Sequence, residues 1–347
     1  MLRSLASDPD YYWIYRFSFG SPEVFENHGE GLWTYRPHVA VREAAVYAIA
    51  SLVPPKIGFV VESDCRTQSN NLGLLQEQDV TPGTSVTLVL GNSFTAGEGG
   101  CPWFDRLQAS RPHERLVNGG LLGTGVEQWR RLVVYLQDRG LTIKRVLAIA
   151  IGNDFKRPPW TWSPEVLACL DEGRCRADHP GVWFSLAPEE THDQLIARAE
   201  RRYAVRFAHY GWFDELLMYL KQHSYLYKFA KRAGETILAV KHGSASKRTG
   251  FRPENEAALD WIRALGIPLR VVMVLPRDEI DMWGNNADTD AAVALLTARK
   301  APYSWCRLTQ ADYMPYDGHP NRDGYDKLAA CAEDALEQME RRSPLSP

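Results

Sequence analysis

Residues Val86–Gly99 read VTLVLGNSFTAGEG, an apolar run that breaks at Gly91 and is followed by Ser93. A short run of β-branched residues and leucine that is bounded by glycine is typical of a buried strand. In an open α/β sheet, ligands bind beyond the carboxyl ends of the strands. Ser93 is therefore expected at the mouth of a site, although serine also favours turns and helix N-caps.

Apolar runs and amphipathic stretches alternate along the rest of the chain. This alternation predicts an α/β fold with a doubly wound parallel sheet. Strands are expected at residues 86–90, 116–118, 146–151 and 269–275, with a fifth at 305–308, and helices at 126–139, 254–265 and 323–341.

Two regions fall outside this pattern. Residues 1–84 are rich in aromatic residues, proline and glycine, and are expected to form an N-terminal appendage. Its aromatic strands, at 11–17 and 32–37, could line a carbohydrate groove, but Trp and Tyr in strands are more often core residues. Residues 160–246 separate the third and fourth strands and are expected to be a mostly helical insertion that caps the site.

Three further segments carry polar residues that follow apolar runs or glycines. They are VNGGLLGTG (117–125), VLAIAIGNDF (146–155) and YDGHPNRDGY (316–325). In this order, and together with Val86–Gly99, they resemble the four blocks of the SGNH (GDSL-like) hydrolase superfamily. The resemblance implies a flavodoxin-like sheet, with residues 85–347 as the catalytic domain.

The resemblance also implies a role for each matching residue. Ser93 matches the nucleophile, His319 the base and Asp317 the acid of a triad. The amides of Ser93 and Gly123 and the side chain of Asn153 match the oxyanion hole. Such chemistry needs these residue types, because a serine hydroxyl requires a nearby base and the carbonyl oxygen gains negative charge that donors must stabilise.

The sequence departs from the family pattern at three places. Asn92 stands where an aspartate is usual, so hydrogen bonding there can survive but the charge cannot. Ile151 replaces a common glycine. The Asp-x-His spacing is one residue tighter than usual, which leaves Asp312 and Asp323 as alternative partners for the histidine.

The function expected from these features is a serine-dependent ester hydrolase that forms an acyl-serine, with a small-molecule or glycan acyl ester such as an O-acetyl carbohydrate as substrate. Three alternatives stay open. One is an O-acyltransferase that acetylates a polysaccharide or glycan hydroxyl, one is a non-catalytic carbohydrate-binding protein on the same frame, and one is an ordinary lipase or thioesterase.

Composition narrows the classes of partner. The 347 residues are 45% hydrophobic with a formal net charge of −3, which gives no electrostatic footprint for nucleic acid. The glycine-rich segments lack the spacing of nucleotide-binding loops, so no cofactor is expected. Neither a Cys-x-x-Cys pair nor a Cys/His cluster with zinc spacing occurs, so no metal is expected.

The longest apolar stretch, 44–53, ends at two prolines and is too short to span a membrane, so no transmembrane segment is expected in this chain. The first residues lack the apolar region of a signal peptide, while an upstream signal or anchor is left open. The cysteine count is even, and the loop between Cys169 and Cys175 could close as a disulfide, which favours an extracytoplasmic compartment over a cytosol with reduced thiols. The six cysteines are Cys65, Cys101, Cys169, Cys175, Cys306 and Cys331.

Overall fold

A computed structural model describes residues 12–20, 24–29, 31–52, 55–99, 103–159, 168, 186–187, 189–208, 211–224, 251–280 and 287–342. Most of the expected insertion at 160–246, including Cys169 and Cys175, lies outside these residues, and so does Cys101.

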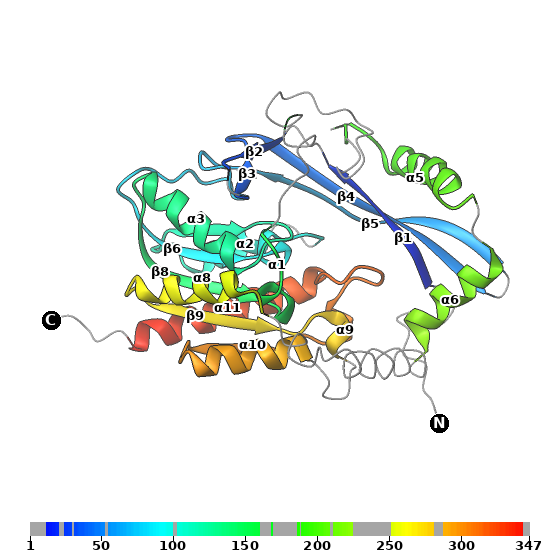
Figure 1. Ribbon diagram of the computed structural model, residues 1–347. Coiled ribbons are helices and arrows are strands. Elements are labelled where there is room, and N and C mark those ends of the chain that lie inside the picture. The colour runs from blue at the N-terminus through cyan, green and yellow to red at the C-terminus, as the bar shows by residue number, and fades with distance from the viewer. Residues whose placement is uncertain are drawn as a thin grey trace.

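Five parallel strands form the main sheet, in the order β10-β9-β8-β6-β7, and Figure 1 labels β6, β8 and β9 among them. Numbered along the chain within this sheet, the order is 5-4-3-1-2, which is the flavodoxin-like arrangement. The strand order reverses between β6 and β8, and ligands bind at the carboxyl ends of the strands beside such a point. The expected α/β doubly wound fold is confirmed. The strands are β6 (Ser85–Gly91), β7 (Leu116–Gly120), β8 (Thr142–Ala150), β9 (Leu269–Val274) and β10 (Tyr303–Cys306).

Helices cover both faces of this sheet because side chains alternate along each strand. In β6, Leu88 and Leu90 lie in one core while Val89 lies in the other. The first core packs under α3 (Val126–Asp138), α8 (Pro253–Ala264) and α10 (Ala287–Ala298), and the second under α2 (Trp103–Ser110) and α11 (Arg322–Arg342). The short helices are α1 (Ser93–Ala96), α9 (Arg277–Ile280) and the 3₁₀ helices η2 (Gly152–Phe155) and η4 (Gln310–Asp312).

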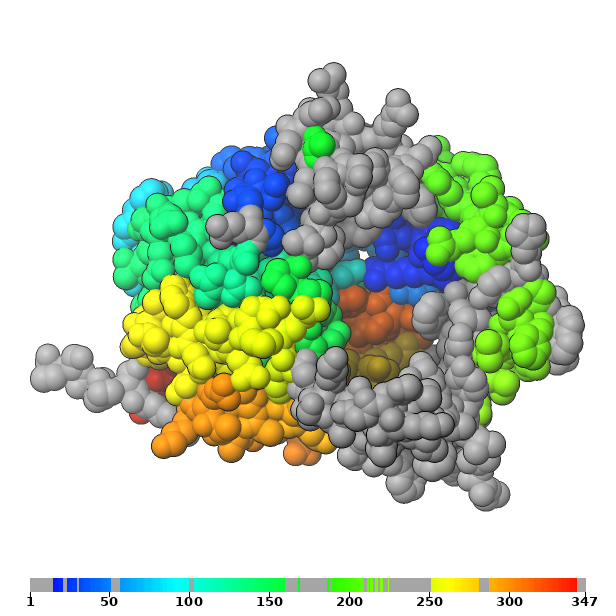
Figure 2. Space-filling view, viewed as in Figure 1, coloured from blue at the N-terminus to red at the C-terminus, as the bar shows by residue number. Residues whose placement is uncertain are grey.

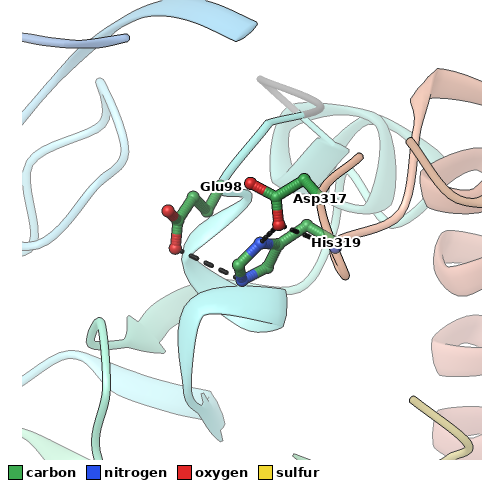
Figure 3. A group of neighbouring side chains, drawn as sticks. All are labelled: Glu98, Asp317 and His319. Atoms are coloured by element: carbon green, nitrogen blue, oxygen red, sulfur yellow. Dashed lines mark hydrogen bonds and ion pairs between the residues drawn. The ribbon is translucent and has the colours of Figure 1, made fainter. Parts of the chain in front are cut away.

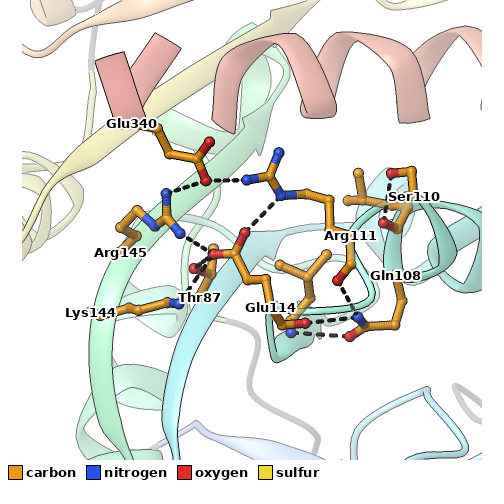
Figure 4. Close-up of polar contacts among 10 residues, drawn as sticks. Thr87, Gln108, Ser110, Arg111, Glu114, Lys144, Arg145 and Glu340 are labelled. Atoms are coloured by element: carbon orange, nitrogen blue, oxygen red, sulfur yellow. Dashed lines mark hydrogen bonds and ion pairs between the residues drawn. The ribbon is translucent and has the colours of Figure 1, made fainter. Parts of the chain in front are cut away.

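A buried carboxylate ties several elements together near the amino ends of the strands (Figure 4). Glu114 accepts hydrogen bonds from Thr87 of β6, from Arg111 at 2.7 Å and from Arg145 of β8. Glu340 of α11 pairs with both arginines. This network holds the end of the sheet that lies away from Ser93.

The N-terminal part of the chain forms a second, antiparallel sheet in the order β1-β4-β5 and a small hairpin, β2-β3. In Figure 1 the long strands extend beyond the parallel sheet and carry α5 and α6. The elements are β1 (Tyr12–Gly20), β2 (Phe25–Asn27), β3 (Trp33–Tyr35), β4 (Ala40–Leu52), β5 (Pro55–Gln68), α5 (His192–Arg206) and α6 (Trp212–His223).

The two faces of the antiparallel sheet have different partners. Phe17, Phe19 and Val46 join a core with residues of α5. The intervening side chains, among them Arg16 and Tyr47, point to the opposite face because the side-chain period of a strand is two residues. That opposite face meets the parallel-sheet unit, as the contacts of Arg16 and Tyr47 described below show.

The aromatic residues of the hairpin are core residues. Trp33 and Tyr35 are buried in the same core as α3, so they do not line a groove. Residues before 84 therefore contribute to two cores, one shared with the parallel sheet and one shared with α5. The division of the chain at residue 84 stays a prediction.

Two further observations concern the cysteines and the helices. Cys306 of β10 is bonded to Cys331 of α11, and Cys65 is also in a disulfide. The helices in the described ranges include none with the length and apolar character needed to cross a membrane.

Candidate active site

Ser93 begins the short helix α1 directly after β6. Asn92 is the N-cap, and its side-chain oxygen accepts the backbone N–H of Phe94 at 2.8 Å. A side chain at Gly91 would come within 1.9 Å of Thr95 Oγ1, so only glycine allows the chain to turn this tightly from strand to helix. The turn places Ser93, which is 6% exposed, at the carboxyl end of β6.

His319 and Asp317 lie on the loop before α11 and meet Ser93 there. Nε2 of His319 is 2.7 Å from Oγ of Ser93, and Nδ1 is 2.5 Å from Oδ1 of Asp317. The same carboxylate oxygen accepts the backbone N–H of His319 at 3.1 Å. The tight Asp-x-His spacing is thus compatible with a bond from the imidazole, because one oxygen serves both donors.

The two alternative aspartates lie away from the imidazole of His319. Asp312 accepts the backbone N–H of Thr309 at 2.7 Å and pairs with Lys327 at 2.7 Å. Asp323 is exposed in the first turn of α11. Of the three candidates, the structure brings only Asp317 to the imidazole of His319.

The antiparallel sheet supplies three further side chains to this site, and sequence reasoning missed all of them. The hydroxyl of Tyr47 donates to Oδ2 of Asp317 at 3.0 Å, and the guanidinium of Arg16 lies 3.5 Å from the same oxygen. Glu62 accepts the backbone N–H of Tyr316 at 2.5 Å. An arginine within the aromatic strand 11–17 was the one sequence signal for this contact.

Glu98 approaches His319 at Nε2, whereas Asp317 approaches it at Nδ1 (Figure 3). Oε2 of Glu98 is 3.3 Å from Nε2 of His319, and Oε1 accepts a hydrogen bond from Arg16. The left-handed turn at Gly97, with φ +89°, ends α1 and brings Glu98 back, and its amide then bonds to the Ser93 carbonyl at 3.0 Å. Arg16 thereby bridges the two carboxylates that flank the imidazole.

These contacts shift the ionisation of the site. Burial would lower the pKa of His319, but the charges of Glu98 and Asp317 outweigh it and raise this pKa above 6.5. Burial would raise the pKa of Asp317, but the hydrogen bond and charge of His319, with Arg16, hold it well below its usual range. The pKa of Glu98 is lowered too, since His319 and Arg16 more than offset its burial.

The same cluster has the spacing of a metal site, because Glu98, Asp317 and His319 place ligand atoms within 4.8 Å of one another. Arg16, however, already supplies a positive charge to both carboxylates. A metal ion would compete with Arg16 and would take Nε2 away from Ser93. We therefore assign no metal to these residues.

The expected oxyanion donors lie on the loops that follow β7 and β8. Gly123 has a φ of +70°, and the side chain of Asn153, in η2, is exposed. Among the described residues, the N–H groups of Ser93 and Gly123 have no acceptor and the side chain of Asn153 has no hydrogen-bond partner. These donors come from the carboxyl edge of β6, β7 and β8, which are neighbouring strands.

Asn92 has a structural role that its departure from the family pattern did not reveal. Its Nδ2 donates to both carboxylate oxygens of Asp154, at 2.6 and 2.8 Å. Asp154 is fully buried and also accepts the backbone N–H of Ile151 at 2.9 Å. The amide thus joins the turn after β6 to the turn after β8, and so links Ser93 to Asn153.

No protein-family model and no curated protein matches this sequence. Several solved structures resemble it at low identity. A lipolytic protein of the G-D-S-L family from Veillonella parvula is 12% identical with a TM-score of 0.34, over 74% of this chain and 100% of that one. AlinE4, an SGNH-hydrolase family esterase, is 13% identical with a TM-score of 0.32, over 75% and 98% of the two chains.

A carbohydrate acetylesterase family member from Sinorhizobium meliloti is 12% identical with a TM-score of 0.31, over 74% of this chain and 98% of that chain. Likenesses this distant do not bear on substrate or mechanism. Two of these three structures are described as a GDSL-family and an SGNH-family protein.

Proposed function

We propose that this protein is a serine-dependent ester hydrolase that works through an acyl-enzyme at Ser93. One observation carries the proposal. Ser93, His319 and Asp317 form a continuous chain of hydrogen bonds, with 2.7 Å from Oγ to Nε2 and 2.5 Å from Nδ1 to the carboxylate. This is the arrangement in which an imidazole activates a serine and a buried acid orients the imidazole.

In the first half of the reaction, Oγ of Ser93 bonds to the acyl carbon and its proton passes to Nε2 of His319. The bond to the leaving alcohol then breaks, and Nε2 returns the proton to the alcohol oxygen. In the second half, water repeats these steps and releases the acid. Asp317 keeps Nδ1 protonated, so that Nε2 is free to accept.

The amides of Ser93 and Gly123 and the side chain of Asn153 are proposed to stabilise the charge that develops on the carbonyl oxygen. Each such donor is worth about 10²–10³ in rate. The absence of partners for these three groups among the described residues supports this role, because donors aimed at a transient charge must be unengaged in the resting enzyme.

A short acyl group suits the charged surroundings of Ser93. His319 next to it is flanked by the carboxylates of Asp317 and Glu98, and Arg16 pairs with both. Such surroundings disfavour the long apolar chains that a lipase accepts. We therefore favour an O-acetyl ester, with an acetylated carbohydrate as the candidate class.

The test uses an aryl acetate and a fluorophosphonate probe. We expect Ser93→Ala to lose nearly all turnover and all labelling while its melting temperature stays near that of the parent, because the hydroxyl contributes only about 1 kcal/mol to stability. Ser110→Ala is the matched control, since that hydroxyl only bonds to the carbonyl of Leu107 at the end of α2.

His319→Ala should lose about as much activity as Ser93→Ala, because the members of a triad act as a unit. Asp317→Ala should lose less than either, yet more than Asp312→Ala. Undiminished hydrolysis by Ser93→Ala would refute the proposal.

A further inference from the structure

The proposed mechanism leaves Glu98 without a role, although it contacts the imidazole at the nitrogen that carries the proton. Oε2 of Glu98 lies 3.3 Å from Nε2 of His319, on the nitrogen that also faces Ser93. The side chain is 17% exposed and paired with Arg16. A carboxylate buried at this point costs free energy unless it interacts favourably with its neighbours.

Its interaction with His319 depends on which form the imidazole takes. In the neutral ring, Nε2 offers a lone pair to the Ser93 hydroxyl, and a carboxylate oxygen beside that lone pair is unfavourable. In the imidazolium, Nε2 carries a proton, and the same oxygen becomes an acceptor and a counter-charge. Glu98 therefore favours the charged ring, which is the form that exists while Ser93 attacks.

We propose that Glu98, held by Arg16, is a positioning residue that stabilises the imidazolium of His319 during the proposed acyl transfer to and from Ser93. The proposal rests on the function proposed above and adds to it a second carboxylate. Asp317 binds Nδ1 and orients the ring, whereas Glu98 acts at Nε2. An interaction that strengthens only when the charge forms accelerates the chemical step.

Arg16 limits this effect. Its guanidinium contacts Glu98 and lies 3.5 Å from Asp317, so it keeps both carboxylates ionised and partly neutralises them. Without Arg16, the negative charges of Glu98 and Asp317 would act on the imidazole of His319 with no positive charge to offset them. Glu43 on β4 also interacts electrostatically with His319. Burial, together with the charge of Glu98, raises the pKa of Glu43 to about 7, so this carboxyl group is largely neutral in mild acid.

The balance between these groups has a consequence for pH. The charges of Glu98 and Asp317 raise the pKa of His319, and a raised pKa keeps the ring protonated, and Ser93 inactive, to a higher pH. Activity should thus rise through an acid limb whose midpoint lies above the ordinary histidine value of about 6.5.

The experiment measures kcat/KM and kcat for an aryl acetate against pH. In Glu98→Gln, which keeps the shape of the side chain but not its charge, we expect the limb to move about one unit toward acid and the plateau of kcat to fall about 10-fold. Arg16→Gln should move the limb in the opposite direction. Glu98→Asp, which keeps the charge but withdraws it from Nε2, should lie between the parent and Glu98→Gln.

Glu43→Gln is the matched control, because it removes a buried carboxylate from the small cavity that Glu98 also lines. Its limb should move less than that of Glu98→Gln, because Glu43 makes no contact with His319 and is only partly ionised near pH 7. NMR titration of His319 in the Ser93→Ala background should show the same shift on Glu98→Gln, with no turnover involved.

An acid limb and an imidazole titration unmoved by Glu98→Gln, or moved equally by Glu43→Gln, would overturn the role of Glu98. Ser93-dependent hydrolysis would survive that result. Loss of the proposed function itself is recognised separately, by activity that persists in Ser93→Ala. Melting temperatures identify any variant that fails to fold. The role of Glu98 is then judged from the variants that do fold.

Discussion

Asn92 shows how much a single neutral side chain decides next to Ser93. Its amide donates to Asp154, whose burial raises the pKa to about 6 against the opposing effects of Arg157 and of Asn92. An aspartate at 92, the usual residue of the family pattern, would place two carboxylates in contact with no water between them. One of them would have to bind a proton. The asparagine at position 92, in place of the usual aspartate, is therefore the residue that suits the buried carboxylate of Asp154.

The pairing of Asn92 with Asp154 predicts that exchanging the two residue types restores the stability that a single substitution loses. Asn92→Asp should lower the free energy of unfolding by about 3 kcal/mol at pH 8, because it leaves a buried charge uncompensated. A carboxylate whose folded-state pKa is raised destabilises the fold as pH rises, so the loss should shrink at about pH 5. Adding Asp154→Asn restores one amide and one carboxylate and should recover most of the stability. Denaturant unfolding at both pH values measures this, and two losses that simply add would contradict it.

Among the elements, the parallel sheet was predictable, whereas of the antiparallel sheet only β1 matches an expected strand, at 11–17. Strands buried on both faces appear in the sequence as continuous apolar runs, so all five were expected close to where they lie, the last of them two residues too late. The hairpin of β4 and β5 was not predicted, because its apolar half, at 44–53, was weighed only as a membrane span. Its polar face carries the residues that meet the site.

The support of the triad could not be predicted for a different reason. Tyr47 and Asp317 are separated by 270 positions in the sequence, and no local pattern encodes such a contact. The proposed triad was suggested by the four blocks, each of which combines a strand end with a particular residue type. Glu98 lies within the first block, but its contacts could not be predicted because its partners Arg16 and His319 come from opposite ends of the chain.

The contact between the elements can be tested at Tyr47. Tyr47→Phe removes the hydrogen bond to Oδ2 of Asp317 but leaves both bonds to Oδ1. We expect kcat to fall about 10-fold with KM little changed, since a hydrogen bond to a charged group contributes about 1.5–3 kcal/mol. Tyr35→Phe is the control, because its hydroxyl bonds instead to Glu43. Equal losses of kcat in the two variants would show that Tyr47 acts only on the fold.

At the scale of the whole molecule, the candidate site lies where the two sheets meet. Figure 2 shows the blue surface of the N-terminal strands next to orange-red surface from the C-terminal part of the chain. The parallel sheet supplies Ser93, the C-terminal loop supplies His319, and β1 and β4 supply Arg16 and Tyr47. A proposed nucleophile that is only 6% exposed is reached more readily by small acceptors than by large ones.

The enclosure bears on whether the acyl group goes to water or to a sugar hydroxyl. Both outcomes share the acyl-serine, so triad variants do not separate them. A bound sugar would outcompete water only if the protein oriented its hydroxyl, where effective molarities reach about 10⁵–10⁸ M. The described side-chain polar contacts of Ser93 and His319 are to one another and to Asp317 and Glu98, and none of them identifies a place where a sugar hydroxyl would be oriented.

We therefore expect hydrolysis to dominate. An aryl acetate should give a burst of phenol followed by steady release of free acetate, and added acceptor oligosaccharide should leave the acetate yield unchanged. Methanol, which is close to water in size, should divert a larger share of the acyl group than the oligosaccharide at equal concentration. Acetylated oligosaccharide that accumulates at the expense of acetate would instead establish a transferase, because only a bound and oriented hydroxyl could overcome the excess of water.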